Sequence, residues 1–311
     1  MKTKQLIPSL NGLRAVSILM VIFFHFRSDN YFVFHSEWAN QLGSVFINGE
    51  LGVNIFFIIS GYLITTLLIK EKNKTGSISL KDFYLRRTLR IFPAYYALLL
   101  VYFVLQCFHY FKLTTTDWLS VILYSKQFFS SPVHEIGHLW SLSVEEVFYL
   151  VYPFLFIRFY KHIKLVVLLL IPVFVIARFH YYEFPLPLLK NTIFTSGDSL
   201  LIGCLFAFEN DKIKRFITQH KFMSVMAFPL VLFSIVANLY IFSVFFHSSN
   251  IRITRFSFLP NLTYSLLGNV GLITNLLVAY LILFSINVRN WWFRFLNTIV
   301  MNYIGLLSYS I

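Results

Sequence analysis

Two ionisable residues, Arg14 and His25, stand eleven positions apart in the first apolar stretch of the chain. At about 100° per residue that offset is close to three full turns, so a helix would carry both side chains on one face, roughly 16 Å apart along its axis. An ionisable side chain in lipid costs several kcal/mol unless it is paired or hydrated, which makes it a functional candidate. The histidine could act as a general base on a hydroxyl group. The structural alternative is a snorkelling arginine with an interfacial histidine.

Two adjacent carboxylates, Glu145 and Glu146, interrupt a later apolar stretch. His138 precedes Glu145 by seven residues, and Ser141 and Tyr149 flank it by four on either side, so a helix would place all of them on one stripe. Carboxylates inside an apolar run are hard to explain as structural features, because burying charge without partners is costly. We therefore interpret the stripe as part of a site. A hydrogen-bonded structural cluster is the alternative.

Three arginines, Arg86, Arg87 and Arg90, follow the second apolar stretch. Arg87 and Arg90 are three residues apart and share a face if a helix has begun there. Two guanidinium groups side by side suit a phosphate, because each offers a fork of N–H donors. Orientation in the membrane and contact with anionic lipid would explain the same residues.

Asp198 lies in a further apolar stretch, where it could cap a helix or pair with Arg14. The two cysteines, Cys107 and Cys204, also lie in apolar stretches and show no metal-ligand spacing. We interpret them as small buried hydrophobic residues, and we expect no metal site.

The composition shows which solvent surrounds these residues. Of the 311 residues, 58% are hydrophobic and only 13% are charged, and the mean hydropathy is +0.70. A typical soluble domain is about 25% charged, and one of this size could not hide so much apolar surface. These values exclude a soluble globular enzyme, a disordered chain and a disulfide scaffold. The protein's main solvent is therefore a lipid bilayer.

Runs of about 20 apolar residues, long enough to cross a bilayer as a helix, recur along the chain. They are continuous and do not alternate, which favours helices over a barrel. We predict an all-α polytopic membrane helix bundle with eight clear spans and a truncated ninth, forming one domain over residues 1–311. The predicted spans are 10–26, 51–69, 91–111, 139–157, 165–183, 191–208, 222–246 and 262–286, and the ninth begins near residue 295.

The formal net charge is +13, and the basic residues are distributed unevenly between the two sides of the predicted spans. Of the 26 Lys and Arg residues, 18 fall in segments that lie inside if the N-terminus is cytoplasmic, 7 fall outside (Arg178 among them), and Arg14 lies in the first span. This split predicts a cytoplasmic N-terminus. The basic residues form no single patch, so we expect no nucleic-acid partner.

An intramembrane histidine, carboxylates on another helix and a basic inner edge fit two kinds of protein. One is a secondary transporter or flippase, which usually carries such residues at broken helices in matched halves; no such pair of spans is evident. The other is an enzyme of group transfer, with an anionic donor on the arginines and His25 as general base on an acceptor hydroxyl.

Four motifs in order resemble acyltransferase family 3, a family of bacterial integral-membrane acyltransferases of the type that O-acetylates surface polysaccharides. The resemblance covers the first half densely and the second half thinly. The dense motifs are Asn11-Gly-Leu-Arg14 with ten residues to His25, GVNIFFIISGYLI at 52–64, FYLRRTLRIFP at 83–93 and HLWSLSVEE at 138–146; the thin ones are DSLLIG at 198–203 and IGLLSYS at 304–310.

The resemblance implies a bundle of about ten spans in the bacterial cytoplasmic (inner) membrane. It implies transfer of an acyl group, usually acetyl, from cytoplasmic acyl-CoA (acetyl-CoA). The acceptor would be a hydroxyl of an extracytoplasmic carbohydrate or lipid-linked glycan, such as lipopolysaccharide O-antigen or exopolysaccharide. Acyl-CoA would be a substrate, with no permanently bound cofactor.

The resemblance also assigns roles to residues. His25 matches the family's essential histidine and Arg14 its partner, Arg87 and Arg90 match the two-arginine motif at the coenzyme A end, and Glu145 and Ser143 match the fourth-span motif. We therefore expect catalysis from His25, Arg14 and Glu145. We expect substrate binding from Arg86, Arg87, Arg90, His138, Ser143, Tyr149 and Asp198.

The chain also departs from the family pattern. Asn54 stands where an acidic residue is common, Val147 replaces a frequent glutamine, and Ser196 stands where an arginine often precedes the aspartate motif. Family members continue past the position of Ile311, so we expect the chain to lack the C-terminal end of its domain. An inactive truncated membrane scaffold is therefore an alternative beside the transporter.

Overall fold

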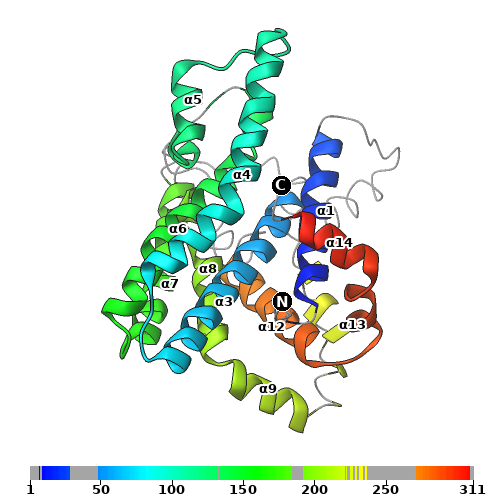
Figure 1. Ribbon diagram of the computed structural model, residues 1–311. Helices are drawn as coiled ribbons and strands as arrows, with labels where there is room; N and C mark the ends of the chain where they lie inside the picture. The colour runs from blue at the N-terminus through cyan, green and yellow to red at the C-terminus, as the bar shows by residue number, and fades with distance from the viewer. Residues whose placement is uncertain are drawn as a thin grey trace.

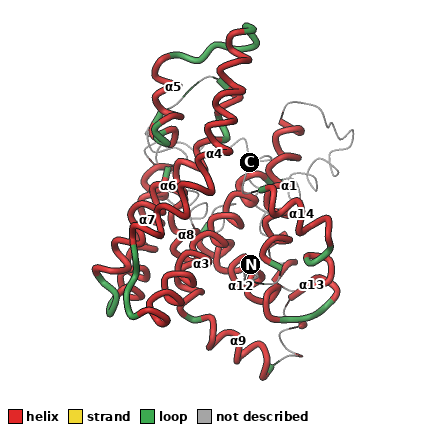
Figure 2. Tube along the Cα trace, viewed as in Figure 1, coloured by secondary structure: helices red, strands yellow, loops and turns green. Residues whose placement is uncertain are grey.

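The computed structural model is helical throughout the part of the chain that it describes (Figures 1 and 2). Described are residues 7, 9–28, 48–129, 131, 133–183, 192–220 and 271–308, together with 222, 225, 226, 228, 229, 231–233, 235, 236 and 266. The α-helices are α1 (Leu10–Ser28), α3 (Gly49–Thr75), α4 (Leu80–Cys107), α5 (Thr115–Ile122), α6 (Leu139–Arg158), α7 (Ile163–Glu183), α8 (Ile193–Phe208), α9 (Asn210–Gln219), α12 (Leu272–Asn287), α13 (Trp291–Leu296) and α14 (Ile299–Leu307), and two 3-10 turns are η1 (Lys126–Phe128) and η2 (His134–Ile136).

Four of the described helices are long and apolar enough to cross a bilayer: α3, α4, α6 and α7. Three shorter apolar helices, α1, α8 and α12, coincide with three further predicted spans. The predicted span 222–246 lies largely outside the described residues, as does the first part of the predicted span 262–286. The all-helical membrane fold is thus confirmed, and the count of eight or nine spans and the orientation of the N-terminus stay predictions.

The ninth predicted span, from residue 295, has a different form. Its residues belong to two short helices, the end of α13 and all of α14, which are separated at Asn297 and Thr298. The Thr298 hydroxyl accepts a hydrogen bond from the Met301 amide and so caps the second helix.

Helix α3 lies at the centre of the bundle, packed against α1 on one side and α8 on another (Figure 1). Two glycines let the backbones of α3 and α8 touch. A Cβ atom on Gly61 would stand 1.9 Å from the carbonyl oxygen of Leu200, and one on Gly203 would stand 2.1 Å from that of Ile58. Small residues thus allow these two helices to pack closely.

Helix α4 begins eleven residues before the predicted span 91–111, at Leu80. Ser79 caps it by accepting a hydrogen bond from the Asp82 amide. The apolar run predicted only the later part of α4, because the first turns of this helix are polar. The arginines therefore lie inside the helix, and α4 continues past the bundle to where α5 runs beside it (Figure 1).

Candidate active site

Glu145 occupies the centre of the candidate site, on α6. Its side chain is buried, and its Oε1 accepts hydrogen bonds from two hydroxyl groups, those of Ser60 on α3 and Tyr149 one turn further along α6. A carboxylate that accepts two hydrogen bonds is stabilised in its buried position. Tyr149 is where the spacing predicted it. Ser141, the other predicted flanking residue, instead donates to the carbonyl oxygen of His138 at 3.1 Å.

Three arginines act electrostatically on this carboxylate. Arg87 acts on Glu145 most strongly among them, followed by Arg14 and Arg90. The Arg87 guanidinium carbon lies 3.6 Å from the centroid of the Tyr149 ring, so the phenol that donates to Glu145 also stacks against the cation. The guanidinium carbon of Arg14, a buried residue, lies 5.7 Å from the centroid of the Phe56 ring.

We call these residues the Glu145 cluster, with α1, α3, α4 and α6 each contributing. Helix periodicity explains its geometry: Arg87 and Arg90 share one face of α4, because that helix has already begun at Leu80. Ser60 reaches Glu145 at the point where α3 carries small side chains. The members of the cluster are Ser60, Glu145 and Tyr149 with Arg14, Arg87 and Arg90.

His25 lies at the other end of α1 from Arg14, half-buried, with its ring edge-to-face against Phe24 at 5.6 Å between centroids. The rise of the helix separates the two residues by roughly 16 Å. Phe24 in turn packs on Gly49, where a Cβ atom would stand 2.7 Å from the Phe24 ring. The predicted catalytic pair therefore spans a length of α1, with Arg14 in the cluster and His25 near the start of α3.

Two of the predicted binding residues, Arg86 and Ser143, make contacts away from the cluster. Arg86 is exposed and forms an ion pair with Glu71 at 3.1 Å, which joins the end of α3 to the start of α4. The hydroxyl of Ser143 donates to the carbonyl oxygen of Tyr124, and so anchors the loop before η1. His138 is the N-cap residue of α6, and its side chain makes no capping hydrogen bond.

Asp198 pairs with an arginine that the sequence did not single out. Both of its oxygens accept from Arg178 on α7, at 3.1 and 2.8 Å, and Oδ2 also accepts from the Asn275 amide at 3.2 Å. Of the two alternatives for Asp198, a helix cap or a pair with Arg14, neither describes this arrangement. Arg178 was assigned to an outer segment because it stands near the end of its span, yet it is fully buried within α7.

Asn54 also belongs to this second polar group. Its Oδ1 accepts from the hydroxyl of Ser199 at 3.1 Å, and that hydroxyl accepts from Asn275 at the same distance. An amide at position 54 can join such a neutral chain of hydrogen bonds.

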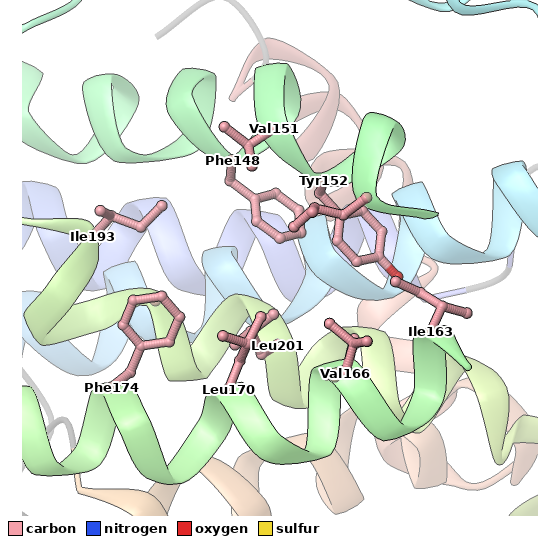
Figure 3. Close-up of a pocket in the computed structure, with 12 residues that line it drawn as sticks. Phe148, Val151, Tyr152, Ile163, Val166, Leu170, Phe174, Ile193 and Leu201 are labelled. Atoms are coloured by element: carbon pink, nitrogen blue, oxygen red, sulfur yellow. The ribbon is translucent and has the colours of Figure 1, made fainter. Parts of the chain in front are cut away.

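An apolar cavity lies between α6, α7 and α8. Figure 3 shows Phe148 and Tyr152 of α6 facing Leu170 and Phe174 of α7 across it. The described residues that line it include no carboxylate, imidazole or guanidinium group, and this lining suits an apolar chain. The other lining residues are Val151, Leu155, Ile163, Val166, Val167, Ile193, Gly197 and Leu201.

Comparison with known proteins adds a family to this geometry. The profile of a family described as an acyltransferase domain matches residues 7–311. The peptidoglycan O-acetyltransferase OatA of Listeria monocytogenes (serovar 1/2a, strain EGD-e) is 32% identical over 178 residues, and the O-acetyltransferase OatA of Staphylococcus aureus (strain NCTC 8325) is 33% identical over 177. Each match covers 52% of this chain and 26% of the relative. The matched segment is thus about a quarter of each relative's length. No solved structure matches the chain.

Proposed function

Because the chain belongs to the acyltransferase domain family, we propose that it is an integral-membrane O-acyltransferase of the bacterial cytoplasmic membrane. It transfers an acyl group, usually acetyl, from acyl-CoA to a hydroxyl of a glycan outside the cytoplasm. The names of its relatives support this, since one is called a peptidoglycan O-acetyltransferase. The observation that carries the proposal is the Glu145 cluster, in which arginines from two helices converge on one buried carboxylate.

The donor end of the site is the pair Arg87 and Arg90. Three guanidinium groups stand around Glu145 and its neighbour Glu146, so the cluster holds more positive than negative charge. A surplus of positive charge attracts an anion, and guanidinium forks match phosphate oxygens; Arg90 is exposed, so it is accessible to such an anion. The phosphates of coenzyme A supply that anion, and in the predicted orientation they approach from the cytoplasmic side.

His25 performs the proton transfer at the far end of α1. A ring nitrogen of neutral His25 accepts the proton of the acceptor hydroxyl while the hydroxyl oxygen forms a bond to the thioester carbonyl carbon. The carbon–sulfur bond then breaks, and the thiolate takes up the proton from His25 and leaves as coenzyme A. Acyl-CoA must bind in an extended conformation to bring its thioester to His25, because roughly 16 Å of helix separates Arg14 from His25. Arg14 lies along this path.

Release of free coenzyme A thiol tests the proposal. Membranes expressing the full chain receive acetyl-CoA, with or without an extract of bacterial surface glycans and peptidoglycan fragments. General base catalysis contributes about 10²–10⁴-fold, so His25→Ala is expected to lose thiol release by that factor while the protein stays in the membrane. His220→Ala is the matched control, because this exposed histidine ends α9, far from the cluster in the sequence.

Release that depends on His25 and on the glycan extract is the predicted result. Equal release by wild type and His25→Ala contradicts the assignment of the base. Substrate movement without any release of thiol contradicts transfer and identifies a transporter.

A further inference from the structure

Three buried polar atoms near the Glu145 cluster have no hydrogen-bond partner among the described residues: Nε of Arg87, Oε1 of Glu146 and the hydroxyl oxygen of Tyr124. A buried donor or acceptor without a partner costs about 1–3 kcal/mol, and more when it is charged. Folded proteins keep such atoms rarely, so each needs an explanation.

These atoms belong to one neighbourhood. Two residues that stand three positions before and after Glu146 on α6, and so share its side of the helix, contact the other two groups. The Ser143 hydroxyl donates to the Tyr124 carbonyl oxygen, and the Arg87 guanidinium carbon lies 3.6 Å from the centroid of the Tyr149 ring. Each of the three groups is thus close to Glu146 or is Glu146 itself, yet no hydrogen bond joins them. One ligand that reaches all three groups can form the hydrogen bonds that they lack.

Tyr124 is held firmly in this place. Its ring stacks on Tyr95 with 4.3 Å between centroids and a 26° angle, and on Phe92 at 5.4 Å and 21°. Its backbone has φ 51°, a conformation that aromatic residues seldom adopt. The Ser143 hydroxyl fixes it by donating to the Tyr124 carbonyl oxygen. Such conformations persist where the surrounding structure over-determines them, and they gather at functional sites.

The chemistry of the three groups selects the ligand. A carboxylate accepts hydrogen bonds, a guanidinium donates them and a phenol does both. Sugar hydroxyl groups also donate and accept hydrogen bonds, so they can meet all three groups. A phosphate fits less well, because Glu146 would repel it. The phosphate end of the donor therefore belongs with Arg90 and the terminal N–H groups of Arg87, and the glycan with Glu146 and the Nε of Arg87.

We propose that Glu146, Tyr124 and the Nε of Arg87 form the subsite that binds a sugar of the glycan acceptor. This inference rests on the proposed function and names its acceptor-binding residues. Glu146 lies in the first half of α6 and Tyr124 in the connection from α5, which both fall on the outer side in the predicted orientation. The acceptor thus enters from the side opposite the coenzyme A phosphates.

Equilibrium binding tests the subsite without requiring turnover. The full chain is purified in nanodiscs, and its affinity is measured for muropeptides from digested peptidoglycan, for O-antigen fragments, and separately for acetyl-CoA. Glu146→Gln and Tyr124→Phe keep the shape of each side chain while removing one hydrogen-bonding function. Both variants are expected to bind the glycan at least tenfold more weakly, because hydrogen bonds to buried charged groups are the stronger ones. Their affinity for acetyl-CoA is expected not to weaken.

Matched controls come from the outer end of α4. Tyr102 already donates to the carbonyl oxygen of Glu135 at 3.1 Å, and Glu135 is exposed. Tyr102→Phe and Glu135→Gln should therefore leave glycan affinity within about twofold of wild type, which separates a specific effect from general damage to the fold.

Three results would overturn the subsite. The first is equal glycan affinity in wild type and both variants, which would mean that water alone satisfies the three atoms. The second is a loss of affinity for acetyl-CoA alone, and the third is a wild type that binds neither glycan. Failure of the proposed function is separate, because it would show as absent thiol release in the transfer assay whatever the binding results.

Discussion

Two groups of charged side chains, each with buried members, lie among the described helices, and they differ in charge balance. Arg178 and Asp198 form a pair of one cation and one anion, joined by two hydrogen bonds at 3.1 and 2.8 Å, with both side chains fully buried. The Glu145 cluster places three arginines around Glu145 and Glu146, and its Arg87 Nε and the Glu146 Oε1 beside it have no partner among the described residues.

This difference separates a structural role from a functional one. Burial of charge is common to both groups, so burial alone does not identify the site. A pair of one cation and one anion is balanced in charge, whereas a surplus of positive charge attracts an anion from outside the chain. The Arg178–Asp198 pair therefore ties α7 to α8, and we propose that the Glu145 cluster binds substrate.

Removal of one partner from the balanced pair should have the largest effect on stability. Asp198→Ala leaves the Arg178 guanidinium buried without its anion, which typically costs about 3–5 kcal/mol. We expect a fall of that size in the free energy of unfolding, measured by denaturant titration in mixed micelles. The double variant Arg178→Met with Asp198→Leu should recover most of the loss, because apolar side chains of similar volume often replace a buried pair without penalty. A stable Asp198→Ala variant would mean that the pair is not structural.

Moving the carboxylate of Glu145 should instead lower the activity. Glu145→Asp keeps the charge and withdraws it by one methylene from Ser60 and Tyr149. A displacement of about 1 Å at a site can cost on the order of 10²-fold in rate. We expect kcat/KM for acetyl transfer to fall by about that factor, with little change in unfolding.

The same exchange in reverse, Asp198→Glu, serves as the comparison. It should lower stability and leave kcat/KM of the folded fraction close to wild type. Equal activity losses in the two variants would erase the distinction between the two groups.

The α3–α8 contact, which positions both groups, should be sensitive to one added methyl group. Gly61→Ala would place a Cβ atom 1.9 Å from the Leu200 carbonyl oxygen, so the helices must separate. Overpacking of this kind costs about 1–3 kcal/mol. Gly197→Ala is the matched variant: its nearest neighbours are side-chain atoms of Ile193 and Phe174, at 3.2 and 3.4 Å, which can give way. Thermal unfolding should rank Gly61→Ala below Gly197→Ala, and the opposite order would contradict this packing.

Loss of an exposed ion pair should have the smallest effect on the free energy of unfolding. A hydrogen bond from Lys164 lowers the pKa of Glu209, and Lys212 lies 3.2 Å away. A carboxyl whose folded pKa is depressed stabilises the protein above its unfolded pKa of about 4.3, and that contribution is lost as the pH falls through the folded value. Because these lysines are solvent-accessible, Glu209→Gln should cost at most about 1 kcal/mol at pH 7. The difference from wild type should vanish in acid, as unfolding measured across pH would show; a difference that persists there would exclude this ion pair as its cause.

Features that depend on spacing along one helix could be predicted from the sequence. The separation of four residues placed Tyr149 beside Glu145, and that of three placed Arg87 and Arg90 on one face. The apolar runs located the long helices, because hydropathy reports directly on burial in lipid. The family resemblance is confirmed by the match over residues 7–311.

Pairings between helices could not be predicted in the same way. Asp198 meets Arg178 on the preceding helix, and Ser60 meets Glu145 on a helix far along the chain, because of how these helices are rotated and aligned against each other. No single-sequence pattern carries that information. Tyr124 was missed for another reason, since it stands in a loop whose conformation depends on stacking against α4.

Binding of acetyl-CoA to the arginines tests the central claim most directly. The purified wild type and the double variant Arg87→Ala with Arg90→Ala are heated with and without acetyl-CoA, and Arg215→Ala on α9 serves as the control. A ligand at 100 times its Kd stabilises a protein by about 2.7 kcal/mol. Wild type and the control should show this stabilisation, and the double variant should lose it. A double variant that acetyl-CoA stabilises as strongly as wild type would contradict the account.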